Sequence, residues 1–108
     1  MTQANNFVAT FVTAPNMVTA RKLASLALNS KLVACANLVP KIESHYWWEG
    51  KLESSSEVLI VFKTTRDQLD SLEKLVLQNH PYNTPEIICF KMEQGNEKYL
   101  EWIQSSMK

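Results

Sequence analysis

Apolar residues along the first third of the chain switch from a strand pattern to a helical one. A run rich in β-branched and aromatic residues covers 7–13 and ends before Pro15, which cannot continue a strand ladder. From 16 to 28 the apolar positions recur at the spacing of one helical face, with Leu23 and Ala27 among them. The pattern predicts a first strand followed by a first helix.

The middle of the chain predicts a long hairpin. Segment 32–48 is apolar on both sides of Pro40, and we interpret it as one strand that is bent or bulged at the proline. A tip near Gly50 follows, and the return strand resumes at Leu52 and runs through 57–64. Both strands carry apolar residues on both faces, which indicates that both faces of this sheet region are buried.

The last third predicts a second helix, a strand and a short terminal helix. Residues 65–68 read Thr-Arg-Asp-Gln and fit a T-x-x-Q capping box, and an apolar stripe then continues at helical spacing to Asn79. A strand covers 86–92 and stops at Gly95. Beyond it, apolar residues at helical spacing predict the terminal helix.

The predicted order is β-α-β-β-α-β with one further helix. This is the ferredoxin-like split β-α-β plan, an α+β fold in which two helices cover one face of a four-stranded antiparallel sheet. The length of 108 residues and the 45% hydrophobic content suit a single domain spanning 1–108. The uncovered sheet face is apolar and carries Tyr46, Trp47 and Trp48, so we expect a homo-oligomer that buries it.

Charge and composition remove several classes of function. The 11 basic and 11 acidic residues give a formal net charge of zero, and no basic run supplies the attraction that nucleic acid or an anionic membrane surface needs. The chain has two glycines, too few for the glycine-rich loops that bind nucleotide phosphates. No window is apolar enough for a membrane span. We expect no nucleic-acid or membrane partner.

The two cysteines, Cys35 and Cys89, lie far apart in the sequence. Neither belongs to a CxxC pair or precedes a histidine cluster, which argues against a zinc module and a disulfide framework. Residues 1–6 are polar and lack the features of a leader peptide. We expect two reduced thiols in a cytoplasmic protein.

The segment 80–87 carries the most concentrated candidate chemistry. Two prolines restrict it, and between and beside them stand His80, Tyr82 and Glu86. A loop with so few conformations can hold these side chains in a fixed geometry. The alternative is that His80 only complements the dipole of the helix that it ends.

Several motifs together resemble the divalent-cation tolerance (CutA) family, and they occur in the family's order and spacing over nearly the whole chain. They are Ala34-Cys35-Ala36-Asn37, the run from Ser44 to Lys51, His80-Pro81-Tyr82, Pro85-Glu86-Ile87 and Tyr99-Leu100-Glu101-Trp102. The resemblance implies a ferredoxin-like subunit in a tight homotrimer. It also implies a non-enzymatic protein that binds copper or a related divalent ion and takes part in the response to metal ions.

The resemblance carries over a copper site only in part. Some bacterial members are thought to use a cysteine before the Thr-Ala-Pro turn and two adjacent histidines before the Pro-Tyr pair. This chain has Val12, Asn79 and His80 at those positions. We therefore expect weak copper binding, with His80, Glu86 and Cys35 as candidate ligands, because tight Cu(II) sites collect several nitrogen or oxygen ligands. A free cysteine in an apolar strand more often packs as a small hydrophobic residue.

A cleft at the subunit boundary is the second candidate site. We expect Tyr46, Lys63 and Tyr82 to converge there with His80 and Glu86 on a small anion or a metal ion. The aromatic residues expected at the trimer interface are Trp47, Trp48, Tyr99 and Trp102.

Two other classes of function stay open. One is a trimeric scaffold or signalling module that binds a protein partner or a small ligand, with the charged loop 93–98 as its display element. The other is an enzyme that uses the cleft. His80, oriented by Glu86, would be its general base, but no nucleophile with an adjacent base is encoded locally.

Overall fold

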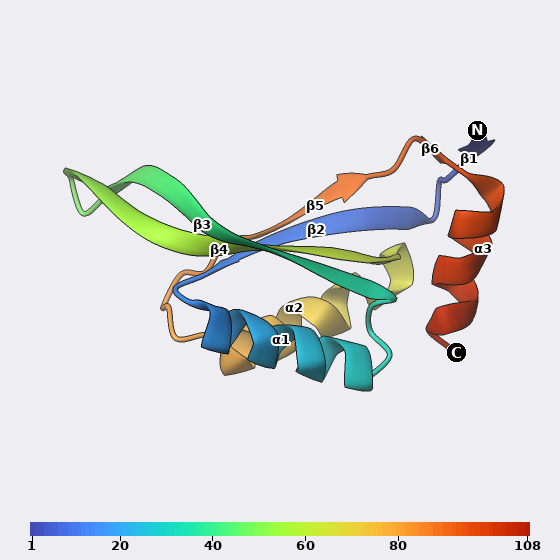
Figure 1. The fold of residues 1–108 in the computed structure, drawn as a ribbon, viewed down its shortest axis with the longest axis horizontal. Helices are drawn as coiled ribbons and strands as arrows, with labels where there is room; N and C mark the ends of the chain where they lie inside the picture. Colours follow the sequence, from blue (N-terminus) through green and yellow to red (C-terminus); the bar gives the residue numbers. More distant parts are fainter.

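The computed structural model describes residues 1–108 and places a four-stranded antiparallel sheet at the centre of the molecule. The strands lie in the order β3 (Cys35–Trp48), β4 (Lys51–Thr65), β2 (Phe7–Ala14) and β5 (Ile87–Lys91). Two helices, α1 (Met17–Asn29) and α2 (Leu69–Asn79), lie side by side against one face of it (Figure 1). The predicted α+β fold and the order β-α-β-β-α-β are confirmed.

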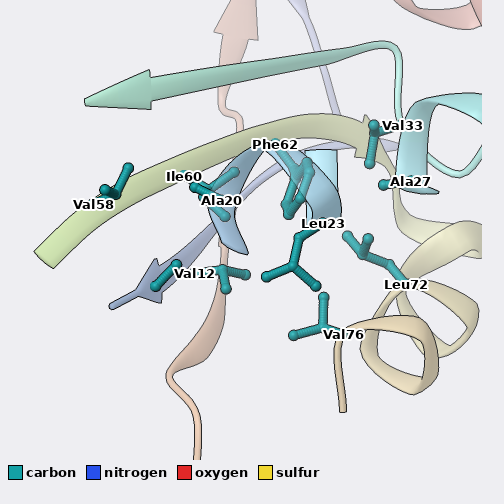
Figure 2. Packing of buried hydrophobic residues seen from close by; sticks show 11 residues of the cluster. Val12, Ala20, Leu23, Ala27, Val33, Val58, Ile60, Phe62, Leu72 and Val76 are labelled. Carbon is teal, nitrogen blue, oxygen red and sulfur yellow. The ribbon is translucent and has the colours of Figure 1, made fainter. Parts of the chain in front are cut away.

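The core lies between the sheet and the two helices. Figure 2 shows the side chains of β2 and β4 pointing at those of α1 and α2. Ile60 and Phe62 of β4 meet Leu23 of α1 and Leu72 of α2, and all four are 0% exposed. Successive strand residues point to opposite faces, so the same strands present a second row of side chains on the uncovered face.

The predicted bulge in the long strand is confirmed. The pairing of β3 with β4 shifts register between Val39 and Ile42, and Lys41 has a positive φ of 59°. The strand begins at Cys35, three residues later than we predicted. The difference arises because Lys31, with φ of 60°, turns the chain after α1, so that residues 32–34 form a connection.

The predicted capping box at the start of α2 is wrong. A short 3-10 turn, η1 (Arg66–Gln68), precedes the helix. Neither Thr65, which precedes η1, nor Gln68, which precedes α2, makes a side-chain capping bond. Instead, the Thr65 hydroxyl donates to the Asp67 carboxylate at 2.5 Å. The hydroxyl is thus oriented by the charged acceptor two residues away, and its oxygen accepts no capping bond from a backbone N–H.

A second, two-stranded sheet joins the N-terminus to the last strand region. It pairs β1 (Thr2–Gln3) with β6 (Gln94–Gly95), and α3 (Glu97–Ser106) follows directly. Segment 93–98 is therefore not the display loop that we expected. The sequence pattern missed this sheet because each strand has two residues, too few to show a period.

Ala4, Leu100 and Ile103 form a small separate core beneath this second sheet. Figure 1 shows α3 and the N-terminus together at one end of the molecule, opposite the tip of the β3–β4 hairpin. None of the helices has the length and hydropathy that crossing a membrane requires.

Candidate functional site

A cleft of about 740 Å³ lies between the outer half of the β3–β4 hairpin and the loop that follows α2. The hairpin contributes residues 43–46, Trp48, Ser55 and Glu57, and the loop contributes 82–84 and Glu86. Thr13, near the end of β2, closes the cleft at its inner side. The cleft exists because β3 and β4 extend well beyond the other two strands, as Figure 1 shows.

The charged side chains on the cleft are predominantly acidic. Glu43, Glu57 and Glu86 all line it, and no lysine or arginine does. The remaining titratable lining group besides the tyrosines is His45, whose Nε2 lies 2.8 Å from Oε2 of Glu43. This contact is exposed, with the two side chains 60% and 82% accessible. The electrostatic character of this one-chain cleft therefore favours a cation over a small anion.

Glu57 is the buried carboxylate of the cleft. It is 8% exposed, and its Oε2 accepts a hydrogen bond of 3.0 Å from the Tyr82 hydroxyl. No cationic side chain pairs with it. A buried carboxylate without a counter-charge is costly, which makes Glu57 the strongest attractor of a cation in the cleft.

Together with partial burial, the contact with Glu57 contributes to a raised pKa of the Tyr82 phenol. Partial burial comes first among the causes, followed by the hydrogen bond and the negative charge of Glu57, and together they raise the pKa of Tyr82 from 10.0 to about 12. Tyr46 stands on the opposite wall, where its hydroxyl lies 3.2 Å from that of Ser55. Tyr46, Tyr82 and Glu86 thus line one cleft within a single chain.

Lys63 lies outside this cleft within one chain, and its convergence with Tyr46 and Tyr82 at a subunit boundary stays a prediction. Its ammonium donates to Oδ1 of Asn37 at 2.7 Å and lies 5.8 Å from the centre of the Tyr99 ring. Lys63 stands six residues from Glu57 on β4, which at about 3.3 Å per residue separates them by roughly 20 Å.

The three candidate copper ligands also lie apart. Cys35 faces Lys63 across β3 and β4, and its thiol contacts Asn37 Oδ1 at 3.5 Å. Glu86 lines the cleft, and His80 is buried behind it with both ring nitrogens bonded. No group of three or more histidine, cysteine or acidic side chains in the chain is arranged to hold a metal ion. The predicted ligand set does not fit a metal site within one chain.

The four aromatic residues expected at an interface are all exposed. Trp47 is 73% exposed on the hairpin, while Trp48 lines the rim of the cleft. Tyr99 and Trp102 stack on the outer side of α3, with ring centres 5.5 Å apart and planes inclined by 30°. The two pairs belong to opposite ends of the molecule (Figure 1).

Sequence reasoning missed three residues of the cleft as site residues. Glu43 and His45 belong to the bent strand, and Glu57 opens the apolar return strand. The available signal was a carboxylate at the start of an otherwise apolar run. It was insufficient because the same pattern also describes a solvated strand end.

Comparisons with known proteins agree over nearly the whole chain. The family model described as "CutA1 divalent ion tolerance protein" matches residues 8–106. Over 101 residues the chain is 44% identical to the chloroplastic protein CutA 1 of Oryza sativa, covering 94% of this chain and 57% of that protein's length. It therefore spans little more than half of this plant relative.

A bacterial relative and a solved structure extend the match. The divalent-cation tolerance protein CutA of Yersinia pestis is 39% identical over 103 residues, which cover 95% of this chain and 87% of that protein. The crystal structure of CutA1 from Oryza sativa superposes with a TM-score of 0.93 at 42% identity, covering 97% of this chain and 96% of that one.

Proposed function

The chain belongs to the CutA1 divalent ion tolerance family, and from this membership we propose that it is a non-enzymatic, homotrimeric protein that binds copper or a related divalent ion. By binding this ion, the protein takes part in the response to metal ions. The whole of residues 1–108 acts as one domain in this proposal. The observation that carries the proposal is the acidic cleft, with three carboxylates and no lysine or arginine on its walls.

The cleft supplies oxygen ligands and one accessible imidazole. Carboxylate oxygens suit divalent cations, and imidazole nitrogen suits copper. Of the residues expected to bind metal, Glu86 stays in the proposed ligand set, and Glu57, Glu43 and His45 join it. Because no three of the chain's ligand groups are arranged for a metal, the proposed binding is weak and is completed by water or by a second subunit.

Copper titration by calorimetry tests the cation site. We expect Glu57→Gln and Glu86→Gln each to weaken Cu²⁺ binding on the order of tenfold, since each removes a charge at contact distance from the ion. The matched control is Glu101→Gln, which removes one carboxylate on the exposed side of α3 and should leave the affinity unchanged. Equal affinities in wild type and both cleft variants would sink the proposal.

Exposed apolar surface supports the trimer. Phe90 and Ile88 of β5 lie on the sheet face that the helices leave uncovered and are 49% and 47% exposed. Phe11 of β2 packs beside Phe90, with ring centres 4.8 Å apart. Contiguous apolar surface of this kind in a small chain is typical of subunit contacts. Light scattering should give three times the chain mass of 12.4 kDa, and a mass of one chain would refute the trimer.

The size of the cleft favours a second candidate function. A volume of about 740 Å³ exceeds the space that one ion needs, and Tyr46, Trp48 and Tyr82 offer aromatic surface. A small organic cation, or a basic side chain of a protein partner, would suit it. Native mass spectrometry of the purified protein should then reveal an organic ligand that is lost on Glu57→Gln.

A cytoplasmic location completes the proposal. Both cysteines are free thiols, as is typical of a reducing compartment. Fractionation of cells producing the chain would test it, and recovery in a membrane or organellar fraction would count against it.

A further inference from the structure

His80 is enclosed at the junction of three elements. His80 directly follows the last residue of α2. It is 9% exposed, and its side chain reaches the end of β2. There its Nε2 lies 2.7 Å from the carbonyl oxygen of Thr13. On the other side of the ring, Nδ1 lies 3.1 Å from the backbone nitrogen of Tyr82.

These two partners fix the proton on the ring. A backbone carbonyl can only accept a hydrogen bond, so Nε2 must carry the proton and donate it to Thr13. A backbone N–H can only donate, so Nδ1 must present its lone pair to Tyr82. The imidazole is neutral in this arrangement, and neither nitrogen is left over for a further partner.

His80 also supports the side chain of Tyr82. The two rings pack with centres 4.8 Å apart and planes inclined by 53°. The Tyr82 hydroxyl then reaches the Glu57 carboxylate at 3.0 Å. A continuous series of contacts therefore runs from Thr13 through His80 and Tyr82 to Glu57. Thr13, Tyr82 and Glu57 line the cleft, and His80 stands behind them.

We infer that His80 is a positioning residue of the cation cleft and not a metal ligand: its Nε2–H tautomer anchors the loop to β2 and holds Tyr82 on Glu57. A metal ion at Nδ1 would have to displace the Tyr82 N–H, and an ion at Nε2 would have to displace both the proton and the Thr13 carbonyl. The first change removes the acceptor of the part-buried Tyr82 N–H, and the second leaves the buried Thr13 carbonyl without its donor. The inference refines the proposed function, and its geometric part is independent of whether the cleft binds an ion.

Nitrogen NMR of the two histidines tests the inference directly. His45 is the only other histidine, and its side chain is 60% exposed, so it serves as an internal reference for an accessible imidazole. In ¹⁵N-labelled protein we expect the His80 ring to show the Nε2–H tautomer with an unprotonated Nδ1. Added Zn²⁺, which is diamagnetic, should shift the His45 nitrogens and leave those of His80 in place.

An Nδ1–H tautomer, or a His80 nitrogen that shifts at lower Zn²⁺ concentration than those of His45, would overturn the inference. If neither histidine shifts, His80 is again no ligand, and only the place of His45 in the proposed ligand set fails. The two failures are thereby distinguished.

Substitutions at His80 separate positioning from ligation. His80→Gln keeps an N–H near the Nε2 position for Thr13, whereas His80→Ala removes both contacts. We expect both variants to keep the number of Zn²⁺ ions bound per chain, with affinity reduced about fivefold in His80→Ala, the equivalent of one lost hydrogen bond, and partly restored in His80→Gln. A lower number of bound ions in either variant would identify His80 as a ligand and refute the inference.

Discussion

Two threonines of the sheet differ in a way that only their partners explain. Thr10 of β2 and Thr64 of β4 both point into the interior and are 1% and 0% exposed. The Thr64 hydroxyl donates to the Leu32 carbonyl at 2.6 Å, whereas the Thr10 hydroxyl has no hydrogen-bond partner. A buried hydroxyl without a partner loses its hydrogen bonds to water and gains none in the protein. The same substitution at the two positions should therefore change the stability in opposite directions.

We predict that Thr10→Val stabilises the protein by about 1 kcal/mol, because valine has nearly the same shape and no polar atom to desolvate. Thr64→Val is the matched variant and should destabilise by about 1–2 kcal/mol, since it leaves the Leu32 carbonyl unpaired. Urea unfolding measures both. Destabilisation by both substitutions would mean that the Thr10 hydroxyl has a hydrogen-bond partner after all.

Tyr82 gives a prediction on pH dependence. Its pKa is raised from 10.0 to about 12 in the folded protein, so folding favours the neutral phenol. The stabilisation that this provides is complete below pH 10.0 and is lost as the pH rises toward about 12. Absorbance titration of tyrosinate, compared with Tyr82→Phe, should assign the highest of the tyrosine pKa values to Tyr82.

The same titration in Glu57→Gln separates the causes. Removing the carboxylate removes the charge that opposes ionisation, so the pKa of Tyr82 should fall toward its ordinary value. An unchanged pKa would show that burial alone accounts for the shift.

At the scale of elements, the three helix starts differ in whether a side chain caps them. Asn16 caps α1 by accepting from Thr19 N at 2.8 Å, and Asn96 caps α3 by accepting from Tyr99 N at 3.0 Å. The T-x-x-Q signal before α2 fails, because Thr65 bonds to Asp67 instead. The two asparagines thus cap their helices through an accepting amide oxygen, whereas Thr65 is oriented toward Asp67 and makes no capping bond.

We predict that Asn16→Ala and Asn96→Ala each cost about 1 kcal/mol of stability, the usual value of a helix cap. Gln68→Ala, at the start of α2, should change stability by less than about 0.5 kcal/mol, because its side chain makes no capping bond. Thermal or chemical unfolding of the three variants provides the measurement. A loss at Gln68 as large as that at the two asparagines would contradict the corrected account of α2.

At the scale of the whole molecule, the chain has one covered and one uncovered sheet face. The helices bury the first, and aromatic and aliphatic side chains remain exposed on the second and on the hairpin. Figure 1 shows this hairpin extending beyond the rest of the fold, without a helix beneath it. A chain of this size exposing so much apolar surface is expected to associate with copies of itself.

We predict that Phe90→Glu reduces the oligomer to single chains, since it places a charge in the apolar face that the proposed trimer buries. Val18→Glu is the matched control: Val18 is 76% exposed on α1, on the helix side of the molecule, and this substitution should leave the mass unchanged. Light scattering over a range of concentrations measures both. An unchanged mass for Phe90→Glu would exclude this face from the interface.

The candidate site shows where prediction from sequence stops. Tyr46, Tyr82 and Glu86 were expected together, and they share the cleft. Within one chain Lys63 lies toward the other end of β4 with Asn37, so its place in a cleft between subunits stays a prediction. The sequence gives the separation of two residues along one strand. It does not show which residues of other segments lie beside each end of that strand, because this depends on how the strands pair.

The sequence by itself determined the four long strands and the three helices, because alternation, helical spacing and prolines are local signals that each segment carries alone. It also determined the family through motifs in a characteristic order. Only the tertiary structure decided that Glu57 is buried against Tyr82, and that both nitrogens of His80 are already bonded. The bonds from His80 to Thr13 and from Tyr82 to Glu57 join distant segments. Their energies depend on burial and on which donors and acceptors remain free, which no local pattern records.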